Sequence, residues 1–325
     1  DGTPSRPGAA SPQRAPRQRA RRMPLRHRLR RDWPLLVMVL PGMLLFGVFH
    51  YLPSAGNIIA FQDYSPFSGG FTGSPWIGFG NFQRMFTDPA FWAALGNTLT
   101  ITAFQLIFYF PVPIALALML NSVLSTRLRS IVQAVVYLPH FFSWVLVVSL
   151  FQQILGGAGL LAQTLRERGM QPIDAMTNPD GFIALVTAQT VWKDAGWGMI
   201  VFLAALSAID PNLYEASAVD GAGRWRRLWH ITLPGLRPVI VLLLILRLGD
   251  ALSVGFEQFI LQRQSVGAGA AEVLDTYVYY AGFLVQDFGY GAAVGLFKGV
   301  VGLLLILAAN KVAHRFGEQG IYQKS

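Results

Sequence analysis

Residues 214–234 read Tyr-Glu-Ala-Ser-Ala-Val-Asp-Gly-Ala-Gly-Arg-Trp-Arg-Arg-Leu-Trp-His-Ile-Thr-Leu-Pro, a polar and basic segment between two long apolar runs. Asp210 and Pro211 precede it and are typical of a helix N-cap followed by proline at the first helical position. The helix that begins there is predicted to end at Gly221, because glycine readily adopts the left-handed conformation that terminates helices.

A second short helix is predicted to begin at Arg224 and to stop at Leu233, since the residue before a proline, here Pro234, is disfavoured in the helical region. The loop 209–237 is therefore expected to form two short helices around a glycine turn. A basic element of this kind between apolar runs indicates a docking element for another protein.

The chain as a whole has the composition of a membrane protein. Of its 325 residues, 53% are hydrophobic and only 13% are charged, whereas soluble domains contain about 25% charged residues. The absence of cysteine excludes disulfides, thiolate metal sites and cysteine nucleophiles.

Positive charge is concentrated at the N-terminus. Residues 1–32 contain ten arginines and two acidic residues, and so account for +8 of the formal net charge of +9. We expect this tail to be disordered and cytoplasmic, because basic residues that flank a span set the orientation of a membrane protein. Because the same rule accounts for the positive charge of the tail, we do not expect nucleic acid as a partner. The apolar run that follows is too long for a signal peptide and lacks a small-residue cleavage site.

A membrane-spanning helix needs about 20 mostly apolar residues. The sequence predicts an all-α membrane domain over 33–322, with spans at about 33–52, 94–120, 131–154, 182–208, 238–261 and 291–312. Between the first two spans, a helix at the membrane interface is expected around Asn81–Phe86.

Six spans place both termini and the loop 209–237 on the cytoplasmic side. Most basic residues then lie inside, and the outer segments contain only Arg84, Arg166, Arg168 and Arg263. This asymmetry favours the predicted topology.

No motif for catalysis or nucleotide binding is present. The pattern GxxxxGK[ST] does not occur, and the glycines at 156–159 lack the lysine of a phosphate loop. The patterns HExxH and GxSxG are also absent. The five histidines are scattered, and His140 is interpreted as a hydrogen-bonding residue inside the bundle rather than a metal ligand. We therefore predict no catalytic residue, no metal site and no cofactor in this chain.

Ionisable residues inside spans cost about 2.5–3.5 kcal/mol each and are functional candidates. Here they are Lys193, Asp194, Arg247, Asp250, Glu257 and Lys298. Two interpretations stay open: Lys193 or Arg247 pairs with Asp250 or Glu257, or such residues contact a substrate, with tryptophans stacking on sugar rings. The candidate substrate-pathway residues are Gln189, Trp192, Lys193, Asp194, Trp197 and Glu257. The glycines of spans four and six indicate close helix packing: Gly196, Gly198, Gly295, Gly299 and Gly302.

The segment quoted first resembles a loop of the importer permeases of the ATP-binding-cassette superfamily. Their pattern is Glu-Ala-Ala, three residues, Gly, nine residues and Ile-x-Leu-Pro. This chain has Glu215-Ala216-Ser217, then Gly221, then Ile231-Thr232-Leu233-Pro234 at those spacings, and Ser217 is its one departure.

Further segments are similar to the carbohydrate permeases of the maltose-type MalF/UgpA class, and more closely to its LplB-like branch, which serves polysaccharide-derived oligosaccharides. The similar segments are 61–66, 76–82, 86–92, 255–258, 275–279 and 295–298. The stretch 247–250 is more charged than this resemblance would lead us to expect.

The resemblance implies the fold of a type I importer permease (MetI-like) in a bacterial cytoplasmic membrane. It implies a second, homologous permease subunit, two ATPase subunits that hold ATP and Mg²⁺, and an extracellular solute-binding protein as partners, besides membrane lipid. The residues it implies for coupling to the ATPase are Glu215, Ala216, Ser217, Asp220, Gly221, Ala222, Ile231, Leu233 and Pro234. In such loops the glutamate pairs with an ATPase arginine and the glycine allows the turn.

The cargo that we expect is an oligosaccharide. Because Lys193, Arg247 and Lys298 are cations inside spans, we expect an acidic one. The alternatives are the same class of permease with a non-sugar solute, or a membrane channel or enzyme that acts alone.

Overall fold

The computed structural model describes residues 25–123 and 125–315, so the predicted basic tail 1–32 lies mostly outside the described residues. The chain divides into two units, Asp1–Gly56 and Asn57–Ser325. In the first unit, α1 (Leu25–Phe46) continues through a π-helical turn (Gly47–Tyr51) into α2 (Leu52–Ala55). Its most apolar window contains no buried residue, which suits a helix that is apolar all round and faces lipid.

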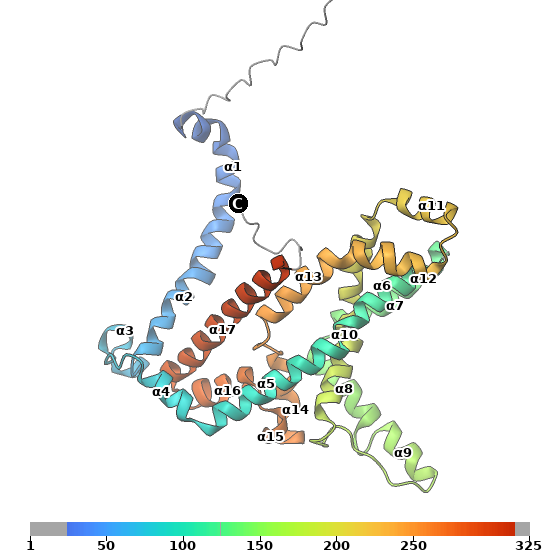
Figure 1. Ribbon diagram of the computed structural model, residues 1–325. Helices are drawn as coiled ribbons and strands as arrows, with labels where there is room; N and C mark the ends of the chain where they lie inside the picture. The colour runs from blue at the N-terminus through green and yellow to red at the C-terminus, as the bar shows by residue number, and fades with distance from the viewer. Residues whose placement is uncertain (1–24, 124, 316–325) are drawn as a thin grey trace, which may run out of the picture. The chain divides into compact units, whose positions relative to one another are not determined.

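The second unit begins with short turns of helix that precede its first long helix (Figure 1). They are η2 (Gly56–Phe61), η3 (Pro66–Ser68) and α3 (Gly70–Gly73). A helix is present where the sequence predicts one around Asn81–Phe86, as α4 (Gly80–Thr87). Next come α5 (Pro89–Phe108) and α6 (Pro111–Asn121), which together form one candidate span of 33 residues.

The next apolar segment is broken, although the sequence predicts one helix over 131–154. The structure has α7 (Thr126–Tyr137), a 3₁₀ turn (Leu138–Phe141) and α8 (Trp144–Leu155). Pro139 lacks the N–H that would continue the α-helical ladder, and the Ser143 hydroxyl starts α8 by accepting from the Leu146 amide at 3.4 Å. A short helix, α9 (Leu160–Glu167), follows.

Helix α10 (Phe182–Ser207) is the central helix of this unit and packs against α5, α6, α7, α8 and α13. Close packing at Gly196 and Gly198 is confirmed. A Cβ atom added at Gly196 would lie 2.1 Å from the Val136 carbonyl oxygen, and one at Gly198 would lie 2.9 Å from Pro113. By contrast, Gly295 and Gly299 have no such neighbour in the described part of the chain.

After α10 the chain bends by 68° into α11 (Pro211–Val219). It then forms α12 (Arg224–Arg227), a π-helical turn (Leu228–Thr232) and α13 (Leu233–Gly249) without leaving the helical region. The prediction that this helix stops at Leu233 is therefore wrong. A π-helical turn widens the helix just before Pro234, and such turns relieve the missing N–H and the ring clash of a proline.

The sequence also predicts one helix over 238–261, but α13 ends at Gly249 and α14 (Phe256–Val266) begins after a break. Gly255 in the break has a φ of +112°, a conformation that other residues avoid. Then follow α15 (Ala268–Ala271), α16 (Leu274–Tyr277) and a π-helical segment, η6 (Val278–Leu284). The last element is α17 (Phe288–Arg315).

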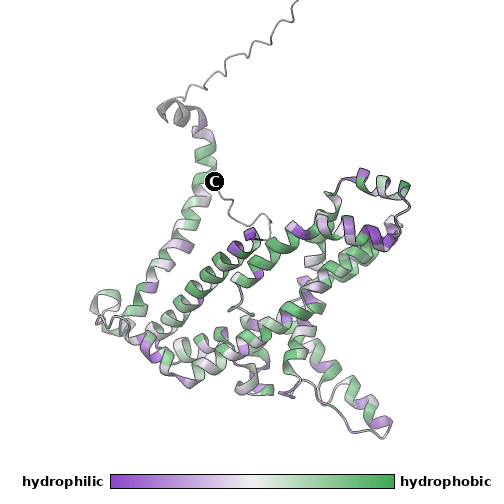
Figure 2. Ribbon diagram, viewed as in Figure 1, coloured by the Kyte–Doolittle hydropathy of each residue, from purple (hydrophilic) through white to green (hydrophobic). Residues whose placement is uncertain are grey.

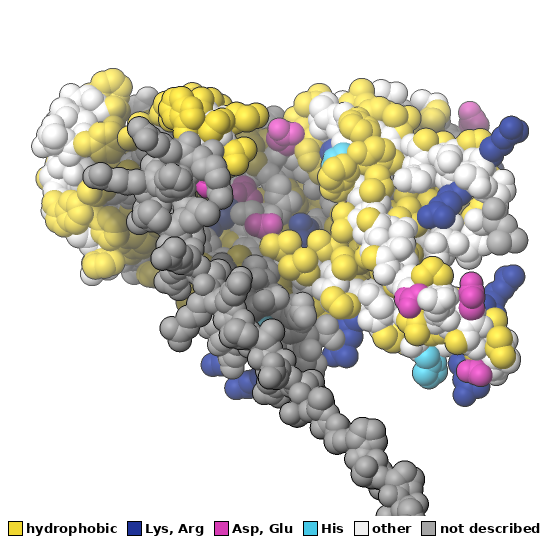
Figure 3. All heavy atoms as spheres, turned by 90° about the horizontal axis from the view of Figure 1, so that it is seen from above, with side chains coloured by type: hydrophobic (Ala, Val, Ile, Leu, Met, Phe, Trp, Pro, Cys, Tyr) yellow, Lys and Arg dark blue, Asp and Glu magenta, His cyan; other side chains and the backbone are white. Residues whose placement is uncertain are grey.

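The all-α fold is confirmed for the part of the chain that is described, where the one β contact is an isolated bridge between Gln62 and Trp76. Among the described residues, five helical stretches are long and apolar enough to span a membrane, or six if α10 and α11 count as one bent span. Apolar residues dominate α5, α6, α13 and α17, and polar residues gather at α12 (Figure 2). Hydrophobic side chains cover much of the surface in Figure 3, as expected where lipid or a partner subunit covers a protein.

Candidate functional site

Helix α11 and the turn after it form the first candidate site. The Asp210 carboxylate accepts a hydrogen bond from the Asn212 amide at 2.9 Å, and Pro211 is at the first helical position, as predicted. The helix ends at Gly221, whose φ is +70°. The Gly221 amide donates to the Ala218 carbonyl at 3.1 Å and the Ala222 amide to the Ser217 carbonyl at 2.9 Å. These two bonds are the glycine-dependent Schellman C-cap.

The side chains of α11 face outward. None of its residues is buried, Glu215 and Ala216 are exposed, and Val219 is 90% exposed. A helix that buries nothing is stabilised by its caps and by few tertiary contacts. One of these contacts joins the Tyr214 hydroxyl to the Thr232 hydroxyl at 3.1 Å.

The other residues that the sequence predicts for coupling divide into two groups. Asp220, Gly221 and Pro234 are exposed, whereas Ser217, Ala222, Ile231 and Leu233 are half-buried. The Ser217 hydroxyl donates to the Tyr214 carbonyl at 2.8 Å, so the serine fits where the resembled pattern has alanine. Arg227 holds the turn closed, because its Nε donates to the Ala222 carbonyl at 2.9 Å. Helices α11 and α12 lie at one end of the second unit, with α9 and α15 at the other (Figure 1).

A polar cluster surrounds the middle of α10. Lys193 is buried and its Nζ donates to the His140 carbonyl at 2.8 Å. The His140 imidazole lies 2.9 Å from the Asp194 carboxylate, as expected for a hydrogen-bonding histidine. Trp197 stacks on the His140 ring at 4.8 Å and is 49% exposed, and Trp192 is partly exposed beside Phe151.

Two of the candidate substrate-pathway residues lie apart from this cluster. Gln189 is fully buried, and its amide exchanges hydrogen bonds with Gln262 and Gln258 of α14 at 2.9–3.0 Å. It therefore joins α10 to α14 and has no exposed surface for a substrate. Glu257 is exposed at the start of α14.

Of the two interpretations left open for the intramembrane charges, the pairing of Lys193 or Arg247 with Asp250 or Glu257 is not found among the residues that the structure describes. Lys193 Nζ lies 3.7 Å from its neighbour Asp194, and Lys298 pairs with Asp275. Arg247 donates to the Gln105 side-chain oxygen at 2.6 Å. Neither Asp250 nor Glu257 pairs with any of these cations in the described chain.

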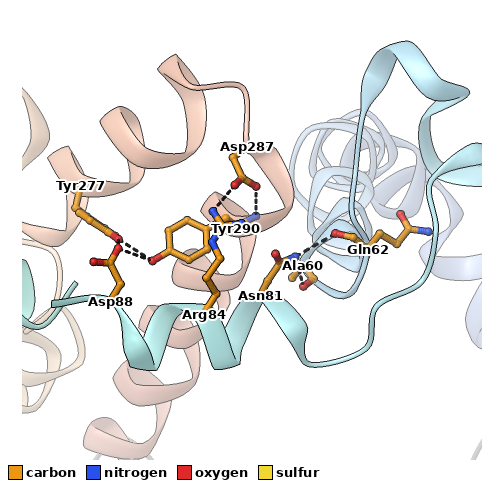
Figure 4. A network of polar contacts seen from close by, with 8 residues as sticks. All are labelled: Ala60, Gln62, Asn81, Arg84, Asp88, Tyr277, Asp287 and Tyr290. Atoms are coloured by element: carbon orange, nitrogen blue, oxygen red, sulfur yellow. Dashed lines mark hydrogen bonds and ion pairs between the residues drawn. The ribbon is translucent and has the colours of Figure 1, made fainter. Parts of the chain in front are cut away.

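A second network, absent from the sequence predictions, lies at the N-terminal ends of α5 and α17 (Figure 4). The Tyr277 hydroxyl donates to Asp88 Oδ2 at 2.5 Å and lies 2.6 Å from the Tyr290 hydroxyl. Arg84 pairs with Asp287 and its guanidinium carbon lies 4.2 Å from the centre of the Tyr290 ring. Residues from two distant parts of the chain, 84–88 and 277–290, meet here, which is why sequence spacing gave no signal.

The pKa values of Asp88 and Tyr277 are shifted within this network. Partial burial acts to raise the pKa of Asp88, but hydrogen bonds from Tyr277, the Ala90 amide and Tyr290, together with the charge of Arg84, outweigh it and lower that pKa. Burial raises the pKa of Tyr277, and its hydrogen bond to Asp88 raises it further. Asp88 is thus a carboxylate and Tyr277 a neutral donor at neutral pH.

The polar groups at the N-terminal end of α4 extend this network toward the preceding segment. The buried Asn81 amide donates to the carbonyl oxygens of Ala60 and Gln62, both at 3.0 Å (Figure 4). Among the described residues, no group of three or more His, Asp and Glu side chains could hold a metal ion.

Comparison with known proteins agrees with the family resemblance of the loop. The chain is 48% identical over 289 residues to the polygalacturonan/rhamnogalacturonan transport system permease protein YteP of Bacillus subtilis, which covers 89% of this chain and 90% of that protein. It is 43% identical to the protein LplB of the same organism, over 90% of this chain and 92% of that protein.

A solved structure shares the fold. It is a bacterial alginate ABC transporter in complex with an alginate pentasaccharide-bound periplasmic protein, with a TM-score of 0.83, 38% identity and coverage of 91% of this chain and 99% of that chain. Residues 109–317 match the family described as the inner membrane component of binding-protein-dependent transport systems. This match covers more than half of the chain and includes α10, the α11 loop and α17, so the chain belongs to that family of transport permeases.

Proposed function

We propose that this chain is the permease subunit of an ATP-driven importer of acidic oligosaccharides. The supporting observation is that the relative with 48% identity is named for polygalacturonan and rhamnogalacturonan, and the similar solved transporter for alginate. These are uronate-containing polymers. Of the three intramembrane basic residues, Arg247 has no carboxylate partner in the described chain, which fits an anionic cargo.

The proposed assembly contains this chain, a second homologous permease, two ATPase subunits that bind ATP and Mg²⁺, and an extracellular solute-binding protein. Transport proceeds by alternating access across a bacterial inner membrane. The missing phosphate loop of this chain fits an energy source on another chain.

In this proposal α11 couples the permease to the ATPase. Its exposed Glu215 pairs with a basic residue of the ATPase, and the exposed Ala216 and Val219 provide an apolar contact. Gly221 fixes the angle between α11 and α12 through its left-handed conformation. The remaining residues of the loop hold α11 on the end of α13.

The coupling role is tested in proteoliposomes that contain the complete importer. We expect Glu215→Gln to lower the binding-protein-stimulated ATPase rate at least fivefold and to lower trigalacturonate uptake with it. Glu167→Gln is the matched control, because Glu167 is an exposed glutamate at the end of α9. If the binding protein stimulated the ATPase activity of the Glu215→Gln importer as much as that of the wild type, and the complex stayed assembled, the coupling role would be wrong.

The turn offers a second, sharper pair of variants. Gly221→Ala forces a Cβ into a φ of +70°, whereas Gly223→Ala meets a φ of −68°, and neither added Cβ has a neighbour within 4 Å. The left-handed conformation costs a non-glycine residue about 1–2 kcal/mol. We therefore expect Gly221→Ala to reduce the binding-protein-stimulated ATPase rate and Gly223→Ala to leave it unchanged.

A further inference from the structure

The three intramembrane cations differ in what balances their charge. Lys298 forms an ion pair with Asp275, and Lys193 lies near Asp194. Arg247 has no carboxylate within 4 Å in the described chain. Its two contacts are neutral: the Gln105 side-chain oxygen at 2.6 Å and the Tyr109 ring, whose centre lies 5.8 Å from the guanidinium carbon.

The position of Arg247 balances only part of its charge. It lies in the last turn of α13, where the helix dipole provides the equivalent of about half a negative elementary charge. Amide and ring groups add dipolar attraction but no net charge. An unmatched arginine inside a span is costly on insertion scales, at about 2.5–3.5 kcal/mol. An anion that binds here would remove that cost.

Gln105 provides an independent observation beside it. Gln105 as a residue is 1% exposed, and its Nε2 has no hydrogen-bond partner in the described chain. The orientation of this amide follows from chemistry, because arginine can only donate and so must face the oxygen. A buried donor without an acceptor is rare and costs about 1–3 kcal/mol.

Both residues therefore lack acceptors. Arg247 has five N–H groups, of which one donates to Gln105, and the Gln105 amide has two free N–H groups. A carboxylate supplies two oxygens and about four acceptor positions, and it is the usual bidentate partner of arginine. The half-buried Tyr109 ring next to them offers a face on which a sugar ring can pack.

We propose that Arg247, Gln105 and Tyr109 form a subsite that recognises the carboxylate of a uronate unit within the membrane-spanning part. This inference rests on the proposed function and assigns substrate recognition to the contact between α5 and α13. The proposed subsite differs from the candidate residues of α10, because Lys193 and Asp194 already pair with each other and Lys193 also donates to a backbone carbonyl.

The test uses the complete importer in proteoliposomes, with its solute-binding protein outside and radiolabelled trigalacturonate as the probe. We expect Arg247→Gln to lower the uptake rate at least tenfold, while Arg247→Lys, which keeps the charge, stays within about threefold of the wild type. Gln105→Glu should also lower uptake at least tenfold, because its carboxylate would occupy Arg247 in place of the substrate. Arg127→Gln, at an exposed arginine in the first turn of α7, is the matched control.

Basal ATPase activity, measured without binding protein, reports on folding and assembly. Uptake losses with unchanged basal activity, and recovery with lysine, support the subsite. The inference is overturned if Arg247→Gln or Gln105→Glu transports at the wild-type rate, if lysine fails like glutamine, or if the basal activity falls in parallel. If the wild-type importer moves no uronate oligomer, the proposed function itself fails, so the two failures are distinguishable.

Discussion

Asp88 carries two structural roles with its two carboxylate oxygens. Oδ1 accepts from the Ala90 amide at 2.9 Å and caps α5, while Oδ2 accepts from the Tyr277 and Tyr290 hydroxyls. Because the hydrogen bonds favour the ionised form, the pKa of Asp88 is lowered in the folded protein. One carboxylate thus connects the start of α5 with α16 and α17.

Removing one donor tests this connection. We expect Tyr277→Phe to destabilise the protein by about 1.5–3 kcal/mol at pH 7, the usual contribution of a hydrogen bond to a charged group. Since the folded-state pKa of Asp88 is the depressed one, this contribution is present above the unfolded pKa of about 3.8 and is lost as the pH falls through the folded value. The thermal midpoint of the detergent-solubilised complex, measured at pH 7 and then at pH values that pass below 3.8, reports both effects.

Tyr279→Phe is the control for that variant. Tyr279 lies two residues further on in η6, and its ring contacts Phe256 and Phe283, but its hydroxyl has no hydrogen bond in the described chain. If Tyr277→Phe and Tyr279→Phe lowered the thermal midpoint equally, the contact between the Tyr277 hydroxyl and the Asp88 carboxylate would contribute nothing to stability.

Single residues could be predicted from the sequence when their role is local. The N-cap at Asp210, the left-handed Gly221 and the hydrogen-bonding role of His140 depend on neighbouring residues or on residue type alone. Gln105 and Tyr277 could not be predicted, because their partners are 142 and 189 residues away. A glutamine inside an apolar run was the one available signal for the Gln105 contact.

At the scale of elements, the approach of α10 to α7 depends on the absence of a side chain at Gly196. An added Cβ would lie 2.1 Å from the Val136 carbonyl oxygen, and this backbone atom cannot rotate away. We expect Gly196→Ala to separate the two helices and to cost about 1–3 kcal/mol, as overpacked cores do. Thermal unfolding of the purified complex should show a lower midpoint.

Gly96→Ala is the matched control, because Gly96 lies in α5 with no atom within 4 Å of an added Cβ. Alanine favours a helix over glycine by about 0.8–1.0 kcal/mol, so this variant should be neutral or slightly more stable. A Gly196→Ala protein that unfolds at the same temperature would contradict the close approach.

Breaks in helices were harder to predict than the helices themselves. Hydropathy averages over about 20 residues and so joins α7 to α8 and α13 to α14, although Pro139 and Gly255 were visible in the sequence. The opposite error occurred at Pro234, where a π-helical turn lets the helix continue. Residues that favour a helix break compete with the need to hydrogen-bond every backbone N–H and C=O group inside a membrane. Tertiary packing decides which of the two prevails.

At the scale of the molecule, the charge asymmetry predicts which end of the second unit faces the cytoplasm, and α11 lies at one end with α9 at the other. The sequence contains no cysteine, so a single introduced cysteine is the one thiol among these 325 residues and can report the sidedness. Val219 on α11 and Phe67 near the start of the unit are 90% and 84% exposed. We expect a membrane-impermeant maleimide to label Phe67→Cys, but not Val219→Cys, in intact cells.

Inverted membrane vesicles provide the reciprocal measurement. There Val219→Cys should react and Phe67→Cys should not, because the cytoplasmic face is now outside. Solubilising either sample in detergent should make both positions reactive, which separates a protected position from an unreactive thiol. Labelling of Val219→Cys in intact cells would place α11 on the outer face, where no ATPase can bind it, and would overturn both the topology and the coupling role of the loop.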